Sequence, residues 1–177
     1  MVKHAIEKKS VIEFEYTDAD SHLTHRLVEP VALTYKWYNW YVFAFCRTKE
    51  DYRLFKLSRI TNLTSTRIQF SRVHGNPEEL MNKHDSMNPV RCLDVKLLCK
   101  ASIRVAVLEY LNGRIAKELD NGDFILELHV PENERMWFSL LLSFGNEVKV
   151  LEPLILRDRI IEKTREIFDL YADYDDI

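Results

Sequence analysis

The spacing of apolar residues changes once along this chain, and that change limits the folds open to it. From about residue 11 to residue 68, apolar and polar residues follow the short period of β-strands, with no helical period between the strands. After residue 92, strand-like segments alternate with segments of three-four helical spacing. The stretch between them is rich in Gly, Asn, Pro, Glu, Lys and Asp. The pattern predicts one domain at 1–74, a linker at 75–91 and a second domain at 92–177.

The first half predicts a small all-β unit. After a short helix at about residues 2–9, strands are expected at 11–16, 25–28, 31–35, 40–45 and 53–60, and residues 60–68 extend the last strand or add a sixth. Pro30 lacks a backbone N–H and is expected at a strand edge or end. Consecutive short strands of this kind favour a small antiparallel barrel or a strongly bent sheet.

The second half predicts a mixed unit. Strands are expected at 93–99, 115–119, 124–130 and about 148–150, with Asn121-Gly122 as a two-residue turn of the second and third strands. Helices are expected at 102–112, between Pro131 and Gly145, and from Pro153 onward. The order βαββαβα is that of a ferredoxin-like βαββαβ domain with an extra C-terminal helix. The fold class expected for the whole chain is therefore α+β.

The last helix and the linker carry two finer signals. Three-four spacing gives the last helix one apolar stripe, formed by Ile160, Ile161, Thr164, Ile167, Phe168 and Tyr171. In the linker, Asn76 and Pro77 are expected to cap and open a short helix that ends near His84.

Charge is divided unevenly between the halves. Residues 1–74 hold 12 Lys and Arg against 8 Asp and Glu, whereas residues 75–177 hold 13 against 20. A basic first half is suited to phosphates and other anions, although a surplus of this size is also ordinary for a solvated surface.

Other features bear on the cellular setting. No apolar run approaches the roughly 20 residues of a membrane span, and the N-terminus lacks the apolar core of a signal peptide. The cysteines, Cys46, Cys92 and Cys99, form no CxxC pair, which favours a reducing, cytoplasmic setting. Cys46 and Cys99 lie in apolar strands and are expected to be buried and inert.

Signatures of catalysis do not occur in this sequence. It has no Gly-rich phosphate loop, no HExxH and no nucleophile elbow, so neither an enzyme nor a cofactor is expected. Six histidines are dispersed along the chain. His22 and His25 share a hairpin turn, but no third ligand lies nearby, so they are expected to be solvated and no metal site is predicted.

Basic residues lie beside aromatic residues in the first half. Guanidinium groups bind phosphates bidentately and aromatic rings stack on bases, so this combination suits planar, anionic ligands. Two alternatives stay open: Trp40 and Tyr41 pack in the core, or an edge arginine pairs with Glu29 or Glu50. The predicted ligand-binding residues are Arg26, Tyr41, Arg53, Lys56 and Arg59.

Several blocks of the first half together resemble the WYL domain. The matching segments are Ala5-Ile6, Ile12–Tyr16, Arg26–Pro30, Asn39–Val42 and Arg53–Ile60, in that order and with short gaps. The family's defining Trp-Tyr-Leu stands here as Trp40-Tyr41-Val42, and Arg26, Arg53 and Arg59 match its basic positions. The second half, including Val150–Arg157, is similar to the C-terminal extension that follows many WYL domains.

The resemblance implies an SH3-like or Sm-like barrel that senses a ligand, often nucleic acid, for a bacterial transcription regulator or a phage-defence system. It also implies a homodimer. DNA operator binding is expected only through a helix-turn-helix, which usually precedes the WYL domain and is absent from this chain. The first hypothesis is a sensor of an anionic ligand such as short single-stranded nucleic acid. The alternatives are a sensor of a small anionic metabolite or nucleotide, and a protein-interaction scaffold without a soluble ligand.

Overall fold

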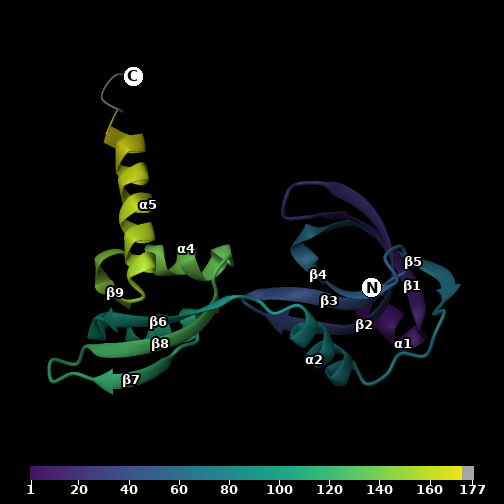
Figure 1. Cartoon of the computed structure of the whole chain (residues 1–177), viewed down its shortest axis with the longest axis horizontal. Coiled ribbons are helices and arrows are strands. Elements are labelled where there is room, and N and C mark those ends of the chain that lie inside the picture. The colour runs from purple at the N-terminus through teal and green to yellow at the C-terminus, as the bar shows by residue number, and fades with distance from the viewer. Residues whose placement is uncertain (173–177) are drawn as a thin grey trace. The chain divides into compact units, whose positions relative to one another are not determined.

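The computed structural model describes residues 1–172, and the chain forms two compact units that divide between Val90 and Arg91. The fold is of the α+β class, with one antiparallel sheet in each unit (Figure 1). Within residues 1–172, no helix combines the length and the apolar character needed to cross a bilayer.

The first unit is a five-stranded sheet with two helices. Its strands lie in the order β4-β3-β2-β1-β5, so β4 and β5 are the edges. The elements are α1 (Val2–Lys8), β1 (Ser10–Thr17), β2 (Leu23–Lys36), β3 (Asn39–Cys46), β4 (Asp51–Lys56), the 3-10 turn η1 (Leu57–Arg59), β5 (Ile60–Gln69) and α2 (Pro77–Met87).

The first unit is the strongly bent sheet that the strand pattern allows, and not the barrel that the resemblance implies: among the described strands, β4 and β5 do not pair, so the sheet does not close. Two strand-level expectations for this unit were wrong. The two strands expected around Pro30 are one strand, β2, because a bulge between Pro30 and Ala32 accommodates the missing N–H. The strand expected at 53–60 ends at Lys56, where η1 turns the chain into β5.

One face of this sheet carries the core. Side chains from alternate positions of several strands meet there, including Phe14 of β1 and Phe55 of β4, whose ring centroids lie 5.2 Å apart. The helix α1 contributes Val2 and Ala5 to the same cluster. The opposite face of β3 is also covered, because Phe43 packs edge-on against His84 of α2 at 5.6 Å.

The expected linker is in part a helix of the first unit. The side chain of Asn76 accepts hydrogen bonds from the N–H groups of Glu78 and Glu79, and Pro77 opens α2, as the sequence predicts. Lys36 at the end of β2 pairs with Asp85 of α2, which fixes the helix to the sheet.

The second unit has the order of elements that the sequence predicts. Its sheet order is β7-β8-β6-β9 and all pairs are antiparallel. The elements are β6 (Cys92–Cys99), the 3-10 turn η2 (Ala101–Ile103), α3 (Arg104–Leu111), β7 (Arg114–Glu118), β8 (Phe124–Pro131), α4 (Arg135–Ser143), the 3-10 turn η3 (Gly145–Glu147), β9 (Val148–Glu152) and α5 (Leu154–Ala172).

The second unit has a buried indole that is hydrogen-bonded, and a hairpin turn that differs from the one the sequence predicts. Trp137 is fully buried in the core, and its indole N–H donates to the carbonyl of Pro131 at 2.7 Å. The turn of the β7–β8 hairpin is longer than the expected two-residue turn: only Gly122 has a positive φ, 85°, and the N–H of Leu119 donates to the carbonyl of Asp123 at 2.8 Å.

The three cysteines differ in accessibility. Cys46 and Cys99 are buried as expected, Cys92 is half-buried, and burial raises the pKa of the Cys99 thiol to about 11. Because the thiolate is the reactive form, Cys99 is expected to resist iodoacetamide in the folded protein at pH 8 and to react once urea unfolds it. Peptide mass mapping before and after unfolding measures this, and rapid alkylation of Cys99 in the native protein would contradict it.

Candidate ligand-binding site

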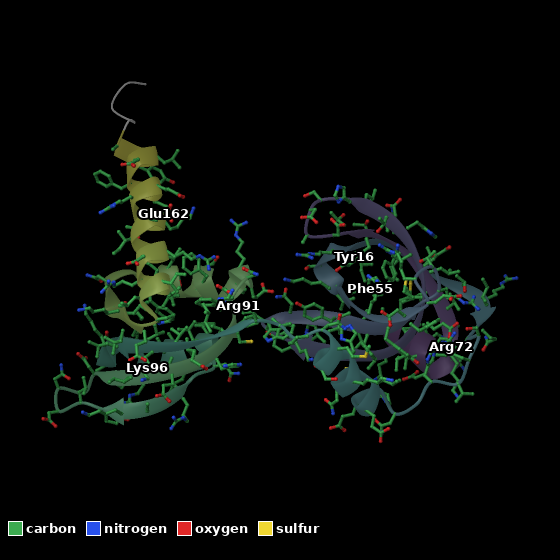
Figure 2. The ribbon with its side chains drawn as sticks, in the orientation of Figure 1. Tyr16, Phe55, Arg72, Arg91, Lys96 and Glu162 are labelled. Carbon is green, nitrogen blue, oxygen red and sulfur yellow. The ribbon has the colours of Figure 1, made fainter. Side chains whose placement is uncertain are left out.

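A cleft of about 390 Å³ opens at the β4 edge of the first unit. Figure 2 labels Tyr16 and Phe55, which lie close together there, and their ring centroids are 5.2 Å apart. We call this the β4 cleft; it is lined by Tyr16, Asp18, Arg26, Asp51, Tyr52, Arg53, Leu54, Phe55, His84 and Asn88.

Strand register explains why two arginines from distant segments reach the same cleft. Arg26 of β2 lies opposite Phe14, and Arg53 of β4 lies opposite Ala44, so both extend from the face of the sheet that carries the core. The sheet curves, which turns the end of the β1–β2 hairpin toward β4. The two guanidinium groups therefore lie at the rim of the apolar core, where the sheet is open.

Among the described residues, no carboxylate forms an ion pair with either arginine of the cleft. The Nε of Arg26 donates to the hydroxyl of Thr24 at 3.1 Å, and Arg53 is exposed. The arginine ion pairs of the described residues involve Arg47, Arg91, Arg104, Arg114 and Arg157.

Two carboxylates also line the cleft, and both accept hydrogen bonds from backbone N–H groups close to them in the sequence. Asp18 accepts hydrogen bonds from the N–H groups of Asp20 and His22, each at 2.9 Å, and Asp51 accepts one from the N–H of Tyr52 at 2.8 Å. The hydrogen bond from His22 holds the pKa of Asp18 below its usual value. The cleft thus offers cationic donors and anionic acceptors side by side, which suits a ligand that has phosphate together with amino or hydroxyl groups.

The open edge of β4 adds backbone donors to the site. The N–H of Tyr52 donates to Asp51, and the N–H of Lys56 lies 3.3 Å from the hydroxyl of Tyr16, so both point away from β3. Because strand geometry repeats every two residues, the N–H of Leu54 points to the same edge. Leu54 lines the same cleft as Arg26 and Arg53.

The other predicted site residues do not line the β4 cleft. Tyr41 and Lys56 are register partners on β3 and β4, and Lys56, three residues from Arg53, lies on the opposite face of the sheet. Arg59 lies in η1, beyond the end of β4. Trp40 is 53% exposed and Tyr41 is half-buried, so neither is a core residue.

Sequence analysis missed the cleft residues that are not basic. Tyr16 and Phe55 were part of the strand pattern but were not assigned to a site. The alternation of side chains along β1 could have identified Tyr16, because it places Tyr16 on the same face of the sheet as Phe14. The alternative that an arginine pairs with Glu29 is also realised, but by Arg47.

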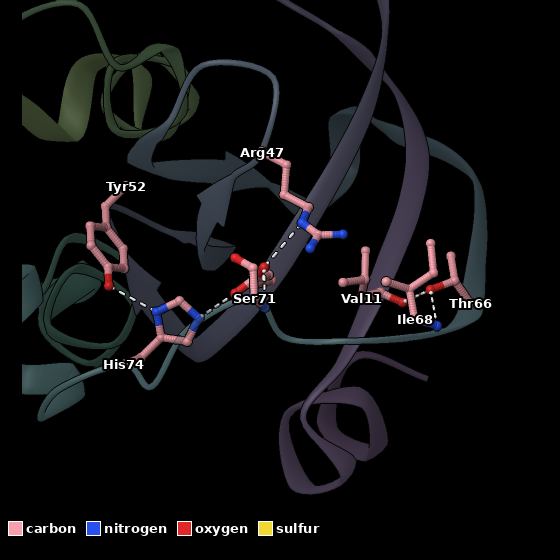
Figure 3. A network of polar contacts seen from close by, with 8 residues as sticks. Val11, Arg47, Tyr52, Thr66, Ile68, Ser71 and His74 are labelled. Carbon is pink, nitrogen blue, oxygen red and sulfur yellow. Dashed lines mark hydrogen bonds and ion pairs between the residues drawn. The ribbon is translucent and has the colours of Figure 1, made fainter.

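A buried carboxylate network lies beside the cleft (Figure 3). The side chain of Glu29 is fully buried; its carboxylate contacts the Nε of Arg47 at 3.1 Å and the Nε2 of His74 at 2.9 Å, and accepts the N–H of Ser71 at 2.8 Å. The other ring nitrogen of His74 is hydrogen-bonded to the hydroxyl of Tyr52, a residue of the cleft, at 2.8 Å. The network therefore connects the segment after β5 to the wall of the cleft.

The described residues include one group that resembles a metal-ligand set. Asp18, Asp20 and His22 each offer one ligand atom within 4.8 Å of the others. His22 is largely exposed, as the sequence predicts, and Asp18 is already occupied by the backbone of its turn. The hydrogen bonds of the turn account for this arrangement without an ion.

The fold and the cleft together define an α+β protein of two compact units, with an open cleft lined by two arginines at one sheet edge of its first unit. Residues 1–65 match the model of the WYL domain, and residues 93–168 match the model of the WCX domain. The chain belongs to the WYL-domain proteins, with a WYL domain followed by a WCX domain.

Curated relatives are similar over almost the whole chain. An uncharacterized HTH-type transcriptional regulator of Bacillus subtilis, YobV, is 28% identical over 96% of this chain, and the protein PafC of Mycobacterium tuberculosis is 29% identical over 96%. In both cases this chain spans 54% of the relative's length.

One solved structure shows the same fold at lower identity, and a second is similar. The crystal structure of a CRISPR Cas-related protein aligns with a TM-score of 0.53 at 14% identity, covering 99% of this chain and 51% of that one. The proteasome accessory factor PafBC of Arthrobacter aurescens aligns with a TM-score of 0.45 at 23% identity, covering 90% of this chain and 25% of that one.

Proposed function

We propose that this chain is the ligand-sensing part of a transcription regulator and that it binds short single-stranded nucleic acid in the β4 cleft. The observation that carries the proposal is that Arg26 and Arg53, from separate strands, line one cleft and form no ion pair with a carboxylate of residues 1–172. One relative is named as an HTH-type transcriptional regulator, which supports the regulatory role.

The chemistry of the cleft favours a nucleotide over a simple anion. Two guanidinium groups and the N–H of Leu54 are donors for one phosphate. The carboxylates of Asp18 and Asp51 can accept hydrogen bonds from base amino groups or ribose hydroxyls, and Tyr16 and Phe55 offer ring surface. Binding would shift the regulator between states only through its different affinity for those states.

A fluorescence anisotropy titration with a labelled oligothymidylate tests the proposal. The wild-type chain is expected to bind, and the affinity is expected to fall with rising salt because phosphate contacts release counterions. Arg53→Ala is expected to weaken binding by roughly tenfold or more. Arg59→Ala should have a smaller effect, because Arg59 does not line the cleft. Salt-insensitive binding, or no binding, would refute the assignment.

The second candidate ligand is a small anionic metabolite or nucleotide bound by the same arginines. The volume of the cleft, about 390 Å³, is large enough for a nucleotide. A thermal-shift screen distinguishes the two: a mononucleotide that stabilises the protein and displaces the oligonucleotide favours the small ligand. A ligand at 100 times its dissociation constant adds about 2.7 kcal/mol of stability.

A further inference from the structure

A second cavity of the first unit lies apart from the β4 cleft and has a different lining. It has a volume of about 190 Å³ and lies where the end of α1, the bulge of β2 and the segment between β5 and α2 meet. No residue that lines the β4 cleft also lines this cavity. We call it the α1 pocket; its lining includes Ile6, Lys9, Val31, Phe70, Arg72 and His74.

Hydrogen bonds hold the walls of the α1 pocket in place. Lys9 ends α1 in the left-handed conformation, with a φ of 51°, and its carbonyl accepts the N–H of Phe70 at 2.9 Å. The side chain of His74 is 6% exposed, and both ring nitrogens are engaged, one with the hydroxyl of Tyr52 at 2.8 Å and the other with the carboxylate of Glu29 at 2.9 Å (Figure 3). The pocket is therefore preformed, and His74 offers a ligand ring surface rather than a hydrogen bond.

Most of the remaining lining is apolar. Ile6, Pro30, Val31 and Phe70 supply aliphatic and aromatic surface, and Pro30 and Val31 are themselves buried. Beside Gly75 the pocket is open, since a Cβ added there would have no heavy atom within 4 Å beyond its chain neighbours. At about 30 Å³ for each water-sized group, the volume holds an apolar body of roughly six heavy atoms.

Two cations line the same pocket. The guanidinium carbon of Arg72, which Figure 2 labels, lies 3.8 Å from the centroid of the Phe45 ring, a cation–π contact that positions the group without using its N–H donors. Among residues 1–172, neither Arg72 nor the side chain of Lys9 forms an ion pair or a hydrogen bond with another side chain, and the lining includes no Asp or Glu. Both cations are therefore available to an anionic group at the pocket.

We infer that the α1 pocket is a binding site for a small carboxylate with an apolar body, such as an aromatic or a branched aliphatic acid. The apolar body displaces water from the wall formed by Ile6, Val31 and Phe70, and the carboxylate accepts charge-assisted hydrogen bonds from Lys9 and Arg72. A free phosphate would leave the apolar wall unused, and a neutral hydrocarbon would use neither cation. The site shares no residue with the proposed nucleic-acid site, so it does not depend on the proposed function.

Isothermal titration calorimetry of the whole chain with sodium benzoate tests this site. The wild type is expected to bind benzoate. Benzamide, which has nearly the same shape but no charge, and acetate and inorganic phosphate, which lack the apolar body, are each expected to bind at least about tenfold more weakly. Arg72→Gln and Lys9→Gln are each expected to raise the dissociation constant for benzoate about tenfold, because each removes one charged donor.

Matched controls remove a charge of the same sign outside the pocket. Lys8→Gln on α1 and Arg67→Gln on β5 are at exposed positions that do not line the pocket, so each should leave the dissociation constant within about twofold of the wild type. Arg53→Ala should do the same, because Arg53 lines the β4 cleft and not the α1 pocket.

Amide chemical shifts locate the bound benzoate directly. In two-dimensional NMR spectra, benzoate is expected to shift the amide signals of Ile6, Val31 and Phe70 and to leave that of Leu54 in the β4 cleft in place. A wild type that shows no binding at about 10 mM benzoate, equal affinity for benzamide or phosphate, or a loss with Arg53→Ala equal to that with Arg72→Gln would overturn the inference. These titrations contain no oligonucleotide, so their result is separate from that of the anisotropy titration.

Discussion

Replacement of Glu29 by Gln is expected to lower the free energy of unfolding of the WYL domain by about 3–5 kcal/mol. The carboxylate is fully buried and is contacted by Arg47, His74 and the N–H of Ser71. Gln has nearly the same shape but no charge, and its NH₂ group faces donors where the carboxylate accepts hydrogen bonds. The half-buried guanidinium of Arg47 also loses its partner.

Urea denaturation followed by circular dichroism and tryptophan fluorescence measures this loss. Glu7→Gln, an exposed position on α1, is the control and is expected to change the stability by less than about 0.5 kcal/mol. If Glu29→Gln were as stable as the control, the network would not be a major contributor to the fold.

The contribution of Glu29 also has a definite pH dependence. Burial by itself raises the pKa of Glu29, but hydrogen bonds from Ser71 and His74 outweigh it and leave the pKa below the usual 4.5. A carboxyl whose pKa is lowered by folding stabilises the protein above its unfolded pKa, and the stabilisation is lost as the pH falls through the folded pKa. The difference in stability between wild type and Glu29→Gln should therefore persist down to about pH 5 and shrink below pH 4.5.

Local patterns were sufficient to predict most of the secondary structure. The Asn76 cap, the end of α4 before Gly145 and the start of α5 after Pro153 follow from residues within one turn of each other. The predictions failed where contacts between distant segments determine the structure. Whether Pro30 ends a strand depends on the bulge that β3 permits, and whether the sheet closes depends on how β4 and β5 meet.

The site could be predicted only in part for the same reason. Arg26 and Arg53 are recognisable from sequence as basic strand residues, but only register shows that they share one face and that Lys56 lies on the other. Glu29 was visible as a candidate partner of an arginine. Its actual partners, Arg47 and His74, come from two different segments that only the folded sheet brings together.

Simultaneous replacement of Arg26 and Arg53 by Ala is expected to cause the largest loss of oligonucleotide affinity of any pair in this chain. A hydrogen bond to a charged group contributes about 1.5–3 kcal/mol, which corresponds to roughly 10–150-fold for each arginine. Because Arg26 and Arg53 line the same cleft, together with Leu54, we expect the two guanidinium groups to bind one phosphate together. The loss in the double variant should then differ from the sum of the single losses by about 1 kcal/mol or more.

Salt dependence separates a shared phosphate from two independent ones. If both arginines contact one phosphate, the slope of log affinity against log salt should fall by about 0.7 in the double variant, the value for one phosphate of a single strand. Two independent contacts would give about twice that change. Arg67→Ala, at an exposed position on β5 outside the cleft, removes the same charge as either single variant and is expected to leave the affinity nearly unchanged. An equal loss for Arg67→Ala would mean that the basic surface as a whole, and not the β4 cleft, attracts the nucleic acid.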